Sequence, residues 1–197
     1  MSLKVAIFNH KGGVGKTSLA ISLHEQLQKQ KGSCIVVSND KEGISEEVFD
    51  FYHYSEDVRD FKSDAEVQIF DFGGFTSKDV LDTIAASNVV IVPTLDDLNS
   101  LQSTIDTIAE IKPYNDNIIV IHNQSKEDTF VEKVIAENFD EEDVPVLKVR
   151  HSKIFQNSLL EGKNIEEIAS STGKNKFVYR NIIKEIKDIA EAVSYFE

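Results

Sequence analysis

The chain has 197 residues, a formal net charge of −13 and a single cysteine, Cys34. This length is typical of one domain, here residues 1–197, and the acidic balance argues against nonspecific nucleic-acid binding by the surface as a whole. No apolar run approaches the ~18 residues of a membrane span, and the first residues lack a signal-peptide pattern, so we expect a cytoplasmic protein. Cys34 cannot form an internal disulfide, and its apolar neighbours predict a buried side chain.

Short β-branched runs alternate with helical patterns along the chain. Strands are expected at residues 4–8, 34–38, 67–72, 88–93, 117–123 and 144–149. Helices are expected at residues 16–30, 77–86, 98–112, 128–138, 152–160 and 177–196. Most of these strands are apolar on both faces, which is typical of a sheet covered on both sides. The alternation predicts an α/β fold with a doubly wound, mostly parallel sheet and helices on both faces.

Two stretches carry more specific expectations. The helix at 98–112 should end before Pro113, because proline cannot continue a helix. Its expected buried stripe consists of Leu98, Leu101, Ile105 and Ile108. The acidic and aromatic stretch 41–66 has the weakest pattern, and it predicts a short helix with irregular flanks.

The segment NHKGGVGKTS, residues 9–18, follows the first predicted strand and opens the first predicted helix. In this context a glycine-rich loop lets backbone N–H groups and the helix N-terminus surround phosphate groups, as in P-loop NTPases. Lys16 would reach the β- and γ-phosphates, and the Thr17 hydroxyl would ligate Mg²⁺. A glycine-rich turn with an incidental lysine is the alternative. The expected nucleotide-binding residues of the loop are Gly12, Gly13, Val14, Gly15, Lys16, Thr17 and Ser18.

A second lysine in the loop, Lys11, makes the pattern more specific. KGGVGKT resembles the deviant Walker A loop of the ParA/MinD group of dimerising ATPases. This resemblance implies ATP and Mg²⁺ as cofactors, and it makes Lys11 the signature lysine that reaches the nucleotide of the partner in a homodimer. Lys11 and Lys16 would then both act in catalysis, and nucleotide binding, dimerisation and hydrolysis would depend on one another. A solvated surface charge is the alternative for Lys11.

Two further motifs of this group are present in altered form. Where the group carries DxDPQ, this chain has SNDKE, in which Asp40 matches the second aspartate, which orients the attacking water, and Ser38 replaces the first. After the third predicted strand, IFDFGG has Asp71 where the Walker B aspartate of the group holds Mg²⁺ through water. Gly74 falls where a switch senses the γ-phosphate. A role as a strand-end turn residue is the alternative for both aspartates.

The base that is bound is predicted less directly. Asn123 ends the fifth predicted strand, where related folds have an amide against the adenine edge, and strand-end capping is the alternative. Lys126 stands where a guanine-specific box needs aspartate, so ATP is favoured over GTP. The histidines His10, His53 and His151 lack metal-ligand spacing, which favours loop or packing roles.

Among the branches of this group, the sequence is most similar to the small ParA partitioning ATPases. A single cysteine cannot supply the paired ligands of cluster-carrying members, the acidic C-terminal sequence does not resemble the basic membrane helix of MinD-type members, and no helix-turn-helix pattern precedes the first strand. The resemblance implies a Mg-dependent ATPase for plasmid or chromosome partitioning that binds DNA nonspecifically as an ATP dimer at the nucleoid. A centromere-binding, ParB-like adaptor would stimulate hydrolysis and release it, and no membrane attachment is expected.

The C-terminal region carries a local basic patch on this acidic chain. Its cations are Lys174, Lys176, Arg180, Lys184 and Lys187, against one glutamate. Two copies of the patch in a dimer would reinforce each other on DNA, and solvation of the outer helix face is the alternative. Two other functions stay open: a MinD/ParA-like spatial regulator of another cargo, and a nucleotide-binding adaptor with little turnover, which the altered SNDKE stretch suggests.

Overall fold

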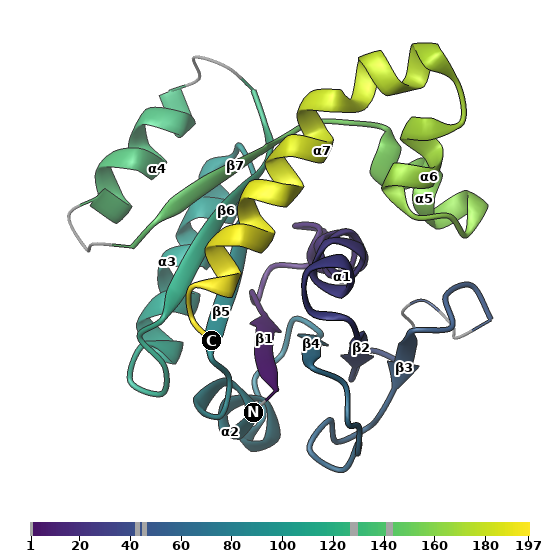
Figure 1. Cartoon of the computed structure of the whole chain (residues 1–197). Coiled ribbons are helices and arrows are strands. Elements are labelled where there is room, and N and C mark those ends of the chain that lie inside the picture. Colours follow the sequence, from purple (N-terminus) through teal and green to yellow (C-terminus); the bar gives the residue numbers. More distant parts are fainter. Residues whose placement is uncertain (1, 42–43, 45–46, 127–129, 141–143) are drawn as a thin grey trace.

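A computed structural model of the chain describes residues 2–41, 44, 47–126, 130–140 and 144–197 (Figure 1). The described residues form a seven-stranded sheet with the order β3-β2-β4-β1-β5-β6-β7, and every neighbouring pair of strands is parallel. The strands are β1 (Leu3–Ile7), β2 (Cys34–Ser38), β3 (Tyr52–Tyr54), β4 (Val67–Asp71), β5 (Val89–Thr94), β6 (Ile118–Ser125) and β7 (Val146–Arg150). The predicted doubly wound α/β fold is confirmed.

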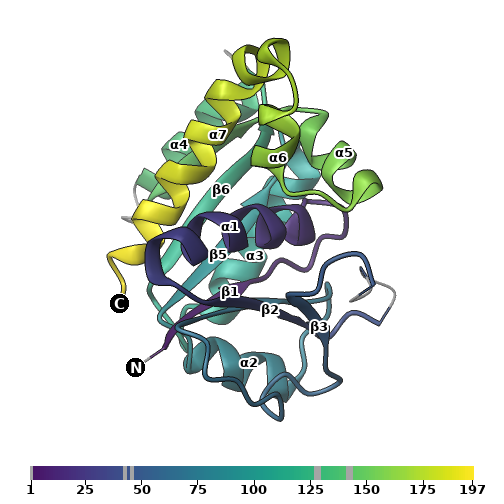
Figure 2. The same cartoon turned by 45° about the vertical axis from the view of Figure 1, so that its right-hand side comes forward.

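Helices cover both faces of the sheet (Figures 1 and 2). They are α1 (Lys16–Lys31), α2 (Lys78–Ala85), α3 (Leu98–Ile111), α4 (Phe130–Asp140), α5 (Ile154–Glu161), α6 (Ile165–Ser170) and α7 (Gly173–Ser194). One core joins the sheet to α1, α5, α6 and α7, and the other joins it to α2, α3 and α4. Strands that are buried on both faces need apolar residues at every position, and β5 is buried over its whole length.

Helix α7 crosses the face of the sheet that also carries α1 (Figure 2). Its buried residues recur at helical spacing: Ile182, Ile186, Ile189 and Val193. The helix begins four residues before the predicted start at 177, because the side chain of Thr172 caps it by accepting a hydrogen bond from the backbone N–H of Asn175 at 3.1 Å. Cys34 is buried in the same core, as its apolar surroundings predicted.

The prediction of a short helix within 41–66 is wrong. The described residues of this stretch contain no helix, and residues 42–43 and 45–46 lie outside the described part. Instead, Tyr52 to Tyr54 form β3, which pairs in parallel with β2. Tyr52 is buried, so the aromatic residues of this stretch complete the core beside the sheet edge rather than one face of a helix.

Three smaller differences from the predicted elements concern helices. Leu98 is 59% exposed, so it is not part of the buried stripe, because the first turn of α3 lies past the end of β5. The short helix α6 was not expected, although Asn164 and Glu167 form a capping box at its start. The helix predicted at 128–138 corresponds to α4, and residues 128 and 129 lie outside the described part.

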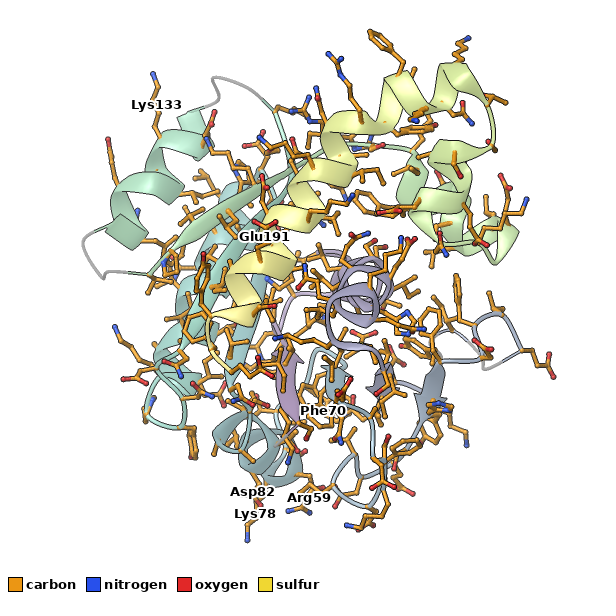
Figure 3. All side chains as sticks on the ribbon, viewed as in Figure 1. Arg59, Phe70, Lys78, Asp82, Lys133 and Glu191 are labelled. Carbon is orange, nitrogen blue, oxygen red and sulfur yellow. The ribbon has the colours of Figure 1, made fainter. Side chains whose placement is uncertain are left out.

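Charged side chains fix the segment before β4 to helix α2 (Figure 3). The guanidinium of Arg59 contacts carboxylates of Asp57 and Asp79 at 2.5 Å and of Asp82 at 2.7 Å. These groups are largely exposed, so solvent screening limits their contribution to stability.

Within the described residues, no helix is both long and apolar enough to cross a bilayer.

Candidate functional site

The carboxyl ends of three neighbouring strands meet at one edge of the sheet. Asp71 at the end of β4 is in register with Ile7 of β1 on one side and with Ser38 of β2 on the other. The chain leaves β1 toward α1 on one face and leaves β4 toward α2 on the opposite face. Ligands of doubly wound sheets bind at such a switch point. The loop at 9–18, Asp40 and Asp71 therefore converge at the expected place.

Gly15 gives the glycine-rich loop its shape. Its φ of +92° lies in the left-handed region, and a Cβ there would be 2.2 Å from the side-chain nitrogen of Asn123. Only glycine satisfies both constraints without strain. Gly15 is also the N-cap of α1, and it supplies no side chain to cap the helix, whose first turn contains no acidic residue. The N-terminal end of α1 is thus suited to an anion.

The ammonium group of Lys16 lies inside the loop. Its Nζ donates hydrogen bonds to the backbone oxygens of Asn9 at 3.1 Å and Lys11 at 3.2 Å. Burial lowers the pKa of Lys16, and the negative charges of Asp71 and Asp40 oppose this effect. Lys16 therefore lies between the loop backbone and two carboxylates, where a phosphate group could replace the two carbonyl contacts.

Asp71 is a buried carboxylate, 2% exposed, at the centre of this edge. Its Oδ2 accepts a hydrogen bond from the hydroxyl of Tyr52 at 2.8 Å, whereas Oδ1 accepts no well-formed hydrogen bond from the described residues. Burial raises the pKa of Asp71 to about 6, against the opposing effects of the Thr17 and Tyr52 hydroxyls and the charge of Lys16. A buried carboxylate oxygen with no well-formed hydrogen bond, near a threonine hydroxyl, fits a hydrated Mg²⁺ ion. Thr17 and Asp71 would hold it.

Asp40 and Lys11 lie at the exposed margin of the site. The backbone N–H of Asp40 donates to the Ser38 hydroxyl at 3.1 Å, which fixes the turn after β2. The carboxylate is close enough to Lys16 to raise its pKa. Lys11 is exposed at the opposite end of the loop from Lys16, so its side chain is accessible to a second molecule. The catalytic roles of both residues stay predictions.

Asn123 contacts the loop directly. Its side-chain nitrogen donates to the backbone oxygen of Val14 at 2.8 Å, and its side-chain oxygen accepts from the backbone N–H of Gln124 at 2.9 Å. The residue is buried, and its contact with Val14 supports the loop. A contact between Asn123 and adenine stays a prediction.

Asn9 belongs to the site although no motif singles it out. It is fully buried, and its side-chain nitrogen donates to the backbone oxygen of Pro93 at 2.8 Å and to the Thr104 hydroxyl at 2.9 Å. Its side-chain oxygen accepts from the backbone N–H of Lys11 at 2.8 Å and from the Ser103 hydroxyl at 3.0 Å. Helix α3 thus anchors the start of the loop. The available sequence signal is the polar stripe of α3 at helical spacing, Ser100, Ser103, Thr104 and Thr107.

Two further residues of the site were not predicted from the sequence. Asn39 accepts a hydrogen bond from the backbone N–H of Gly73 at 2.8 Å, which links the turn after β2 to the loop after β4. Tyr52 holds Asp71, and burial raises the pKa of its hydroxyl, so the group stays a donor. Tyr52 stands in an aromatic run in which the sequence distinguishes no single member.

The histidines have the surroundings of loop and packing residues. The His10 ring lies 2.5 Å from a carboxylate oxygen of Glu110, His53 stacks on Phe61, and His151 is exposed. Among the residues that the structure describes, no group of three or more His, Cys, Asp or Glu side chains could hold a metal ion.

A glycine-rich loop between β1 and α1, with a buried aspartate at the end of β4, defines a P-loop nucleotide-binding protein. The chain belongs to the CbiA family, the CobQ/CobB/MinD/ParA nucleotide binding domain, which matches residues 5–165. A sequence search of curated proteins gives no match.

Solved structures with the same fold include members of three named groups. MinD from Pyrococcus horikoshii with Mg-ADP has a TM-score of 0.70 at 14% identity, over 100% of this chain and 99% of that chain. Apo McdA from Cyanothece has a TM-score of 0.69 at 13% identity, over 100% and 99%. A ParA family ATPase from Chlorobium tepidum has a TM-score of 0.68 at 15% identity, over 96% and 98%. At these identities the similarity establishes the fold.

The raised pKa of Asp71 predicts how the stability of the nucleotide-free protein depends on pH. The folded state binds a proton at this carboxyl with a pKa of about 6, above its ordinary 3.8. Well below pH 4 the group is protonated in both states, and between about pH 4 and pH 6 the unfolded state releases the proton that the folded state keeps, until the folded carboxyl also ionises. Stability from this group is therefore lost as the pH rises from 4 to 7, by about 3 kcal/mol.

Asp71→Asn removes the ionisable group and should remove this pH dependence. Urea unfolding of the wild type and the variant at pH 4.5 and pH 7 measures it, with the variant gaining stability relative to the wild type at pH 7. Parallel pH profiles for the two proteins would contradict the prediction.

Proposed function

We propose that this chain is a Mg²⁺-dependent ATPase that forms a homodimer when it binds ATP. The observation that supports this most directly is the convergence of Lys16, Thr17 and the buried Asp71 at the switch point of the sheet. Bound Mg²⁺ would neutralise charge on the β- and γ-phosphates. ATP and ADP complexes among the structural neighbours support the choice of nucleotide.

Different residues of the chain would bind the phosphates, orient the attacking water and contact the second subunit. The backbone of the loop and the N-terminus of α1 bind phosphate oxygens. Lys16 exchanges its two loop carbonyls for the β- and γ-phosphates, and Asp40, at the exposed margin, orients the attacking water. Lys11, exposed at the start of the loop, reaches the nucleotide of the second subunit. The two lysines would thus act in cis and in trans.

The first prediction from the proposed function separates the two lysines. Lys16→Ala should weaken ATP binding by roughly 100-fold or more, because it removes the buried cation that contacts the phosphates. Lys11→Ala should bind ATP within a few-fold of the wild type but should not dimerise. Light scattering with a nonhydrolysable ATP analogue measures the dimer, and Lys78→Ala, an exposed lysine on α2, is the control. A normal dimer from the Lys11 variant would refute the signature role.

The second prediction concerns Asp40. Asp40→Ala should bind Mg·ATP and dimerise but hydrolyse ATP about 100-fold more slowly, because a water-orienting carboxylate is lost while the phosphate contacts remain. The dimer should consequently persist after ATP is added. Steady-state ATPase rates, compared with Asp106→Ala on the exposed side of α3, test this. Unchanged turnover in the Asp40 variant would move the role to another residue.

The altered SNDKE stretch also favours a second candidate, a nucleotide-binding adaptor with little turnover. In that case the wild type would bind ATP without measurable hydrolysis, and Asp40→Ala would not differ from it.

We further propose that the ATP dimer binds DNA nonspecifically through α7. Four exposed cations recur at i, i+4, i+8 and i+11, which puts them on one helix face opposite the buried isoleucines. They are Lys176, Arg180, Lys184 and Lys187. The stripe spans roughly 16 Å of helix. Lys174 lies two residues before Lys176, about half a turn away and so outside this stripe, and Arg180 stacks over the exposed ring of Phe177 at 4.8 Å. A chain of net charge −13 would need two such stripes to hold DNA.

The third prediction is that DNA binding requires ATP and this stripe. If roughly four cations per subunit meet phosphates, the affinity of the dimer should fall with a log–log salt slope of about −7. Lys176→Glu with Arg180→Glu should lower the affinity at least tenfold. A matched control reverses two exposed lysines elsewhere, Lys78 and Lys133 (Figure 3). Filter binding with ATP measures both, and equal binding by the two double variants would exclude the stripe as the DNA site.

The cellular role that these properties support is plasmid or chromosome partitioning at the nucleoid, with release by a ParB-like, centromere-binding adaptor. A ParA family ATPase is among the structural neighbours, as are MinD and McdA. A spatial regulator of another cargo would not respond to DNA. Adding DNA would then change neither the binding of ATP nor the rate of ATP hydrolysis.

A further inference from the structure

One carboxylate oxygen on α3 joins two loops of the candidate site. Oε2 of Glu110 lies 2.5 Å from Nε2 of His10, which directly precedes Lys11 in the phosphate-binding loop. The same oxygen accepts a hydrogen bond from the hydroxyl of Thr76 at 3.2 Å, in the loop that follows Asp71 and β4. No motif identifies Glu110, and the roles assigned above to the site residues do not include it.

The two loops that Glu110 joins are also in direct backbone contact. A Cβ at Gly74 would be 2.6 Å from the backbone oxygen of His10, so the absence of a side chain at this position allows the close approach. The His10 ring packs edge-on against Phe8 at 5.1 Å, which limits its orientation. A change in the position of one loop must therefore be accommodated by the other or by the Glu110 contacts.

Glu110 contributes to these contacts without being part of the hydrophobic core. Its side chain is 37% exposed, in the last turn of α3, whereas Ile108 and Ile111 beside it pack into the core. A polar contact at this exposure adds little to overall stability. Its two partners, in contrast, belong to the segments nearest to the expected position of the terminal phosphate. The geometry suits a residue that positions loops rather than one that holds the fold.

We propose that Glu110 is a positioning residue that clips the start of the phosphate-binding loop to the loop after β4, and so sets the preference of the site for ATP over ADP. The proposal rests on the proposed nucleotide-binding function. Residues 12–18 would bind the β-phosphate in both nucleotides, whereas the hydrogen-bond partners of Glu110 are His10 and Thr76. The loop that contains Gly74 and Thr76 would respond only to the γ-phosphate, so the clip affects the difference between the two nucleotides.

The experiment compares three variants with the wild type. Glu110→Ala removes both contacts, Thr76→Val removes one hydroxyl at constant shape, and Asp106→Ala is the control from the exposed side of α3, one turn earlier. Two quantities are measured for each protein. The first is the ratio of the dissociation constants for ADP and a nonhydrolysable ATP analogue. The second is the hydrogen exchange of the backbone amides at 73–77 in the nucleotide-free state.

Glu110→Ala should lower the affinity for the ATP analogue about fivefold and leave the ADP affinity within about twofold. Exchange at 73–77 should rise about fivefold in Glu110→Ala and in Thr76→Val, and Asp106→Ala should match the wild type in both measurements. Glu110→Gln keeps an oxygen that can accept the Thr76 bond, so it should recover part of the loss.

If Glu110→Ala lowered the affinities for ADP and for the ATP analogue equally, Glu110 would have a merely structural role, and the proposal would be overturned. Unchanged exchange at 73–77 would overturn it independently of any nucleotide. If the wild type binds neither nucleotide, the proposed function fails and the preference for ATP fails with it, whereas faster exchange in Glu110→Ala would still establish the contact between the loops.

Discussion

Parallel pairing of β1 with β4 aligns Ile7 with Asp71, so the loop that leaves one strand begins beside the carboxylate that ends the other. Pairing of β4 with β2 aligns Ser38 with the same aspartate and brings Asp40 to the margin of the site. Because side chains alternate between the faces of a sheet, a shift of one residue between β1 and β4 would turn Asp71 away from Thr17 and Lys16. The chemistry of the site depends on this register.

Polar contacts keep the loops at this edge in one geometry. Buried polar groups need hydrogen-bond partners, and the fully buried amide of Asn9 finds them in Pro93, Lys11 and the hydroxyls of α3. Asn123 holds the far side of the same loop through Val14. The glycine-rich segment, whose own residues have the greatest conformational freedom, is thus fixed from two sides before any ligand binds. Such preorganisation reduces the entropy that binding must overcome.

The site and α7 carry positively charged side chains, although the chain as a whole is acidic. Asp71 and Asp40 lie near Lys16, and the negative charge of each partly offsets the effect of burial on the pKa of the lysine. On α7 the cations are exposed, and Lys187 lies 3.5 Å from a carboxylate oxygen of Glu166, while the isoleucines of the same helix pack on α1 and the sheet. One helix therefore serves the core and presents a basic surface on a chain of net charge −13.

The sequence by itself determined the elements and the phosphate-binding loop, because both are local properties. Periodicity within one segment predicted the parallel strands and most helices, and the glycines and Lys16 stand within eight residues of one another. Tertiary structure alone decided which side chains complete the site. Tyr52 meets Asp71 across 19 positions of sequence, and His10 meets Glu110 across 100. Contacts of this kind depend on strand register and on how α3 packs, which no single segment encodes. For the same reason the sequence did not predict that Tyr52–Tyr54 form an edge strand, which depends on pairing with β2.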